Sequence, residues 1–100
     1  MADWKLKVIE LTPDKKRLTP GDRVQLGFCN GNSNIVQEHL WVRIFQVLWN
    51  GKFYLAVLET DAVSIDGLRA GQSVTFWPEH VARVRRRTVK ESAARGLLND

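Results

Sequence analysis

Residues 39–58 read HLWVRIFQVLWNGKFYLAVL and contain the strongest local signal of secondary structure in the sequence. Two runs rich in Val, Ile, Phe and Trp flank the dipeptide Asn50-Gly51. β-Branched and aromatic residues favour strands, and Asn-Gly is the preferred pair for a type I′ turn because both central residues need positive φ. The stretch therefore predicts a β-hairpin with strands over 39–49 and 53–58.

The two-residue loop also predicts the register of this hairpin. It pairs Trp49 with Lys52 next to the turn and Phe45 with Ala56 further along. Both faces of the predicted hairpin are largely apolar. We therefore expect it at the centre of a sheet that is covered on each side.

Shorter predicted strands surround the hairpin. Residues 4–11 alternate apolar and charged side chains, which is the period of a half-buried strand. Residues 18–28 predict a turn at Pro20-Gly21 followed by a strand, and residues 30–34 predict a polar loop. Residues 81–84 predict a short strand or a helical turn.

A sequence pattern occurs twice. Residues 18–26 (LTPGDRVQL) and 68–76 (LRAGQSVTF) share Leu, two residues, Gly, two residues, Val, one residue and a final apolar residue. The glycine permits a tight turn that leads into a strand. The pattern predicts two similar turn-and-strand units.

The C-terminal residues predict a different element. Thr88 and Glu91 have the spacing of a helix capping box, good helix formers follow, and Gly96 is a stop signal. We expect a single β domain over 1–86 and a basic segment with a short helix over 87–100. The predicted class is mostly β (β+α): a small antiparallel β roll or SH3-like barrel with a short C-terminal helix.

Charge and cysteine content restrict the setting. The net charge is +4, and residues 1–80 hold nine basic and nine acidic side chains. The excess positive charge therefore lies in residues 81–100, which hold six basic and two acidic side chains. Cys29 is the only cysteine, which excludes an internal disulfide and fits a reducing compartment. The first residues resemble neither a signal peptide nor a membrane span. We expect a bacterial-type cytoplasmic protein without a membrane contact.

The stretch from Glu38 to Val84 resembles an uncharacterised bacterial family, domain of unknown function 2314. The residues that carry the resemblance are Leu40 to Ile44, Gly51 to Phe53, Ala56 to Leu58, Ile65, Leu68, Gly71, Val74 to Phe76 and Glu79 to Val81. The resemblance implies a tryptophan strand, a hairpin, a leucine–glycine turn and a final strand. The sequence departs from the family at 59–62, which lacks the usual Asn and Pro, and at Gln72, where the family has an acid. The family has no established activity.

No catalytic or metal-binding motif stands out. His39 and His80 are the only histidines, and their spacing fits no zinc motif. A pair of Cys29 with a histidine is conceivable, but a lone cysteine of this kind is more often a small buried hydrophobe. The acids are scattered and no phosphate-binding loop occurs. We expect no enzyme activity, no cofactor and no metal.

Two sets of residues are candidates for binding. The first set is an alternating aromatic and basic run that could stack bases: Trp41, Arg43 and Phe45. The alternative is that these aromatic residues fill the core, as large aromatic residues more often do, together with Trp49, Tyr54 and Trp77. The second set is a basic run that fits phosphates, an acidic protein surface, or solubility alone: Arg83, Arg85, Arg86, Arg87 and Lys90.

The leading hypothesis is a non-enzymatic binding or adaptor module that meets a protein partner through a sheet edge or the basic segment. The rival hypothesis is a small nucleic-acid-binding protein that uses the arginine-rich C-terminal segment. The sequence does not predict an oligomeric state.

Overall fold

The computed structural model describes residues 4–9, 17–31 and 33–85. The strands are β1 (Trp4–Leu6), β2 (Arg23–Asn30), β3 (Glu38–Leu48), β4 (Phe53–Leu58), β5 (Ser73–Phe76) and β6 (Val81–Arg85). Two short 3₁₀ turns, η2 (Trp49–Gly51) and η3 (Pro78–His80), precede β4 and β6.

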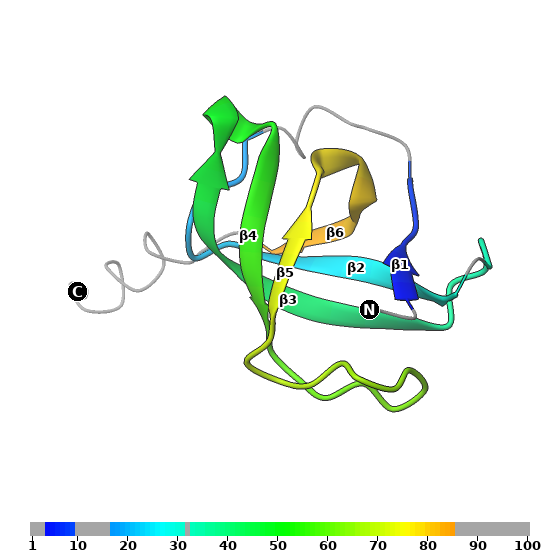
Figure 1. Ribbon diagram of the computed structural model, residues 1–100. Coiled ribbons are helices and arrows are strands. Elements are labelled where there is room, and N and C mark those ends of the chain that lie inside the picture. The colour runs from blue at the N-terminus through cyan, green and yellow to red at the C-terminus, as the bar shows by residue number, and fades with distance from the viewer. Residues whose placement is uncertain (1–3, 10–16, 32, 86–100) are drawn as a thin grey trace, which may run out of the picture.

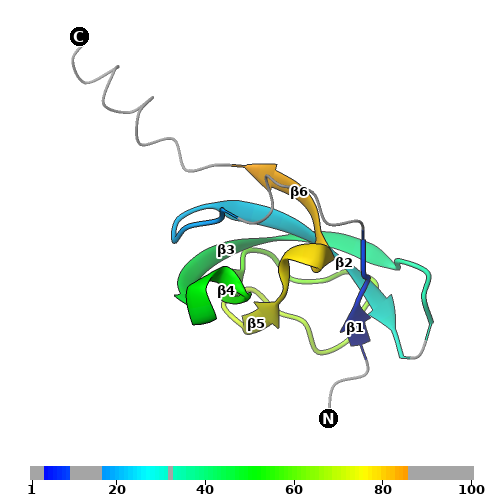
Figure 2. The same cartoon turned by 90° about the horizontal axis from the view of Figure 1, so that it is seen from above.

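All strand pairs are antiparallel and form one curled sheet, a half-barrel (Figures 1 and 2). The strand order is β1-β2-β3-β4-β5, and β6 also pairs with β2. β1 pairs with the last residues of β2 and β6 with its first residues. The predicted mostly β, antiparallel class is confirmed. The expected C-terminal helix lies outside the described residues.

The hairpin of β3 and β4 confirms the central prediction and corrects its register. Leu48 pairs with Phe53, as the two-residue loop requires, but the register shifts between Ile44 and Gln46. Ile44 therefore pairs with Ala56, and the expected pairing of Phe45 with Ala56 is wrong. A bulge of this kind adds one unpaired residue and bends the strand, which suits a sheet that curls.

The hairpin turn is wider than predicted. Asn50 and Gly51 have the expected positive φ values of 56° and 86°, but Trp49 also has a positive φ, of 50°. β3 ends at Leu48, and the Lys52 N–H donates to the carbonyl oxygens of Leu48 and Trp49, both at 3.2 Å. The pairing of Trp49 with Lys52 is therefore replaced by a four-residue turn.

The repeated sequence pattern forms two equivalent turns. Gly21 and Gly71 have φ values of 98° and 90°. The Gly21 N–H donates to the Ile44 carbonyl and the Gly71 N–H to the Leu58 carbonyl, each at 2.8 Å. The two similar turn-and-strand units predicted from the repeat are therefore present. The first borders β3 and the second borders β4.

The inner face of the half-barrel holds the core. Its buried residues alternate along the strands and include Val24, Leu26, Phe28, Leu40, Val42, Ile44, Tyr54, Ala56, Leu58, Val74, Phe76 and Val81. Burial of each Val, Leu, Ile or Phe side chain among them contributes about 1.5–3 kcal/mol. The outer face differs from the prediction, because Arg43 and Phe45 on β3 are exposed. The hairpin is central, but only one of its faces is covered.

The connection between β4 and β5 folds back on the half-barrel. Ile65 and Leu68 are buried in the core. The Glu38 carboxylate accepts hydrogen bonds from the backbone N–H groups of Val63 and Ser64, the latter at 2.8 Å. These contacts give the long connection a defined course without secondary structure.

The chain ends of the described part differ in length from the predictions. β1 is shorter than the predicted 4–11 strand and stops at Leu6, although the Lys7 N–H still donates to the Gly27 carbonyl at 2.9 Å. Of the two alternatives for residues 81–84, the strand is correct, and it extends to Arg85.

Candidate functional site

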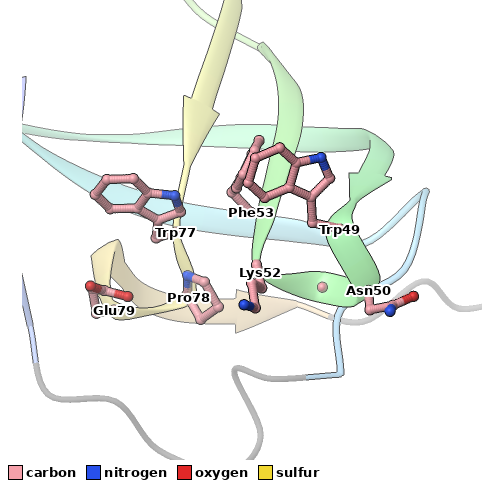
Figure 3. Close-up of a pocket in the computed structure, with 8 residues that line it drawn as sticks. Trp49, Asn50, Lys52, Phe53, Trp77, Pro78 and Glu79 are labelled. Carbon is pink, nitrogen blue, oxygen red and sulfur yellow. The ribbon is translucent and has the colours of Figure 1, made fainter.

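An open groove lies between the hairpin turn and the β5–η3 junction. Its volume is about 520 Å³, and its lining residues are Trp49, Asn50, Gly51, Lys52, Phe53, Trp77, Pro78 and Glu79. Figure 3 shows the indole of Trp77 on one side and the rings of Trp49 and Phe53 on the other. Trp49 is 72% exposed and Trp77 is 50% exposed. Lys52 and Glu79 place one charge of each sign on the groove.

The turn presents Trp49 to solvent at a conformational cost. A positive φ is unfavourable for a bulky residue, by about 1–2 kcal/mol. The Phe53 ring supports the indole, with ring centroids 5.0 Å apart. Strained backbone positions persist where the surrounding structure holds them, and here the turn holds an exposed tryptophan at the groove.

On the opposite side of the groove from Trp49, Trp77 is positioned by His80. The two rings are stacked with centroids 5.5 Å apart, and the Trp77 backbone N–H donates to His80 Nδ1 at 3.0 Å. Nδ1 is therefore an acceptor, which requires the neutral imidazole. Burial lowers the pKa of His80 below 6.5, although the Glu79 carboxylate acts in the opposite direction. Trp77 is thus held in place before any partner binds.

A second surface lies on the outer face of β6, β2 and β3, which are neighbouring strands (Figure 2). Arg23 on β2 stands opposite Arg85 on one side and Arg43 on the other. In the next row of the same face, Gln25 stands between Arg83 and Trp41. We call this set of residues the arginine face: Arg23, Arg43, Arg83, Arg85 and Trp41.

A hollow of about 330 Å³ opens on the arginine face. It is lined by Arg23, Trp41, Glu59, Thr60 and Arg85. The Arg85 guanidinium lies over the Trp41 ring, 5.6 Å from its centroid. Arg23 forms an ion pair with Glu59 at 3.0 Å. The hollow thus combines an aromatic wall with cationic groups.

The structure brings together only some of the predicted site residues. Trp41, Arg43, Arg83 and Arg85 share one face, whereas Arg86, Arg87 and Lys90 lie outside the described residues. Phe45 is on β3 at the bulge and is 46% exposed.

The expectation that large aromatic residues fill the core is correct for Tyr54 and wrong for Phe45, Trp49 and Trp77. Trp49 lies beyond the end of β3 at Leu48 and therefore outside the strand that carries Trp41 and Phe45.

Sequence reasoning missed the groove and the part that Arg23 has in the arginine face. Trp77-Pro78 directly after a strand is a usable signal, since proline ends the strand and leaves the tryptophan at its end. No signal in the sequence connects Trp77 with Trp49, 28 positions away.

The remaining candidates offer little chemistry. Cys29 is fully buried in β2, in agreement with its interpretation as a small hydrophobe. Within residues 4–9, 17–31 and 33–85, no three His, Cys, Asp or Glu side chains gather as metal ligands would. The same part of the chain has no helix with the length and apolar character to cross a bilayer.

Comparison with known proteins adds no relative: no family model, curated protein or solved structure matches this chain.

Proposed function

We propose that this protein is a non-enzymatic binding module that holds an extended segment of a partner protein in the groove between Trp49 and Trp77. The observation that carries the proposal is the pair of exposed tryptophans, each supported by a ring partner, on opposite sides of one open groove. Tryptophan is enriched among the few residues whose loss most weakens binding in protein interfaces.

The shape and composition of the groove favour one class of partner segment. Aromatic grooves bind proline-containing segments in the polyproline II conformation, because this conformation is extended and has no internal hydrogen bonds. The partner's apolar side chains would lie between the indole rings. Lys52 and Glu79 would set its direction through charge.

Further expectations from the sequence belong to the same proposal. The curled sheet, with a 3₁₀ turn before its last strand, supports assignment as an SH3-like barrel. The resemblance to domain of unknown function 2314 is compatible with a binding role. The single cysteine, Cys29, is buried as a free thiol, which supports a cytoplasmic location.

Capture of partners by tagged protein from native lysate, treated with nuclease, tests the proposal. The decisive variant is Trp49→Asn, because asparagine tolerates positive φ and preserves the turn. The matched control is Val63→Asn, since Val63 is 91% exposed on the β4–β5 connection and outside the groove.

A protein partner that binds wild type and Val63→Asn should bind Trp49→Asn at least about 30-fold more weakly, the effect of losing an interface tryptophan. Equal capture by all three proteins would refute the groove as the binding site. A partner lost after nuclease treatment would contradict direct protein binding.

A further inference from the structure

We propose that the arginine face is a binding site for single-stranded nucleic acid, with phosphates on the arginines and a base in the hollow beside Trp41. This site is separate from the groove and does not depend on the proposed function. In the sequence, the run around Trp41 and Arg43 and the C-terminal basic run are two separate candidates, whereas the sheet joins residues of both on one face and adds Arg23 from β2.

The first argument is the arrangement of charge. Arg85, Arg23 and Arg43 are direct cross-strand neighbours, so two like-charged pairs adjoin each other on one face. Like charges in such positions destabilise a sheet. Only Arg23 has a carboxylate partner within the described residues, through Glu59. The row therefore works against folding and is suited to an anionic ligand.

The second argument concerns spacing. Neighbouring strands lie about 5 Å apart, so the row spans about 10 Å from Arg85 to Arg43. Arg83 extends the same face along β6. A chain of phosphates can engage several of these guanidinium groups at once, and each such contact releases counterions.

The third argument selects a single strand over a duplex. The hollow exposes the Trp41 ring with the Arg85 guanidinium over it, and unpaired bases stack on both aromatic rings and guanidinium planes. Bases in a duplex are already stacked. Duplex readers insert a helix or β-ribbon into the major groove, and this face is a sheet surface.

The test measures binding of a labelled oligothymidylate of about 20 nucleotides, which exceeds one site. The decisive variant is Arg43→Gln/Arg83→Gln, and the control Arg17→Gln/Arg69→Gln removes the same charge from exposed positions outside both the arginine face and the groove. The decisive variant should weaken binding and flatten the slope of log K against log salt by about 1.4, because each single-strand phosphate contact contributes about 0.7. Its melting temperature should not fall, since repulsion is relieved.

Trp41 provides a second measurement. Trp41→Ala should weaken oligothymidylate binding by about tenfold to a hundredfold, whereas Trp41→Phe keeps an aromatic ring and most of the affinity. The groove variant Trp49→Asn should bind the oligonucleotide like wild type. A failed test of the arginine face can therefore be told apart from a failed test of partner binding in the groove.

Four results would overturn the proposal. The first is that the wild type does not bind the oligothymidylate at about 50 mM salt, and the second is that it binds a duplex of the same length with equal affinity. The third is that the control variant loses as much affinity as the decisive variant. The fourth is that Arg43→Gln/Arg83→Gln still binds while Arg86→Gln/Arg87→Gln does not. The last result would place the contact in the C-terminal segment alone.

Discussion

The two equivalent turns allow a stability comparison within one protein. In both turns, a side-chain oxygen accepts a hydrogen bond from the backbone N–H three positions earlier. Asp22 Oδ2 accepts from the Thr19 N–H at 2.9 Å, and Gln72 Oε1 accepts from the Arg69 N–H at 3.1 Å. The perturbation is Asp22→Ala in one protein and Gln72→Ala in another. The backbone geometry is shared, so the difference between the two reports on the side chains.

The expected magnitudes follow from charge, burial and the number of bonds. Asp22 is 2% exposed and also accepts from the Thr19 hydroxyl at 3.3 Å. Hydrogen bonds to charged groups contribute about 1.5–3 kcal/mol, and neutral ones about 0.5–1.5 kcal/mol. Asp22→Ala should therefore cost about 3 kcal/mol and Gln72→Ala about 1 kcal/mol. For a domain of this size, the difference corresponds to about 8–16 °C in melting temperature.

Urea unfolding followed by tryptophan fluorescence measures both free energies of unfolding. The slope of the unfolding free energy against urea must be the same in the variants for the comparison to hold. Asp22→Asn should recover part of the loss, because its amide oxygen still accepts from Thr19. Equal costs for Asp22→Ala and Gln72→Ala, or no recovery in Asp22→Asn, would contradict the larger contribution assigned to the Asp22 carboxylate.

Three further predictions concern single positions. Gly51→Val should lower the free energy of unfolding by about 2 kcal/mol or more, because valine must adopt a positive φ of 86°; an unchanged urea midpoint would contradict this. Cys29→Ser should cost about 1–3 kcal/mol, since a hydroxyl is buried, but leave partner capture intact; loss of capture by the folded variant would point to thiol chemistry. Burial lowers the pKa of His80 in the folded protein, so the unfolded chain takes up a proton at His80 more readily. The free energy of unfolding should therefore fall as the pH drops below 6.5. The decrease should be smaller in His80→Gln. Urea unfolding between pH 8 and pH 5 measures it, and the same decrease in the free energy of unfolding for wild type and His80→Gln would exclude the effect.

The sequence predicted the hairpin, the two glycine turns and the positions of most strands. Asn50-Gly51 predicted the hairpin because few residue pairs tolerate positive φ at both positions. The repeated Leu–Gly–Val spacing predicted two turns, since glycine is required where φ is 98° and 90°. Alternation of apolar residues marked the strands. These properties depend on residues close together in the chain.

Contacts between side chains from distant segments became apparent only in the folded sheet. The bulge at Phe45 shifts the register between β3 and β4 and bends β3, and no local pattern around Phe45 predicted it. Trp49 and Trp77 share a groove because β4 and β5 return the chain to the hairpin turn. Strand pairing likewise brings Arg85 and Arg43 to either side of Arg23, although 42 positions separate the two in the sequence. Such contacts follow from long-range register, which is set by burial of the whole inner face and not by any one segment.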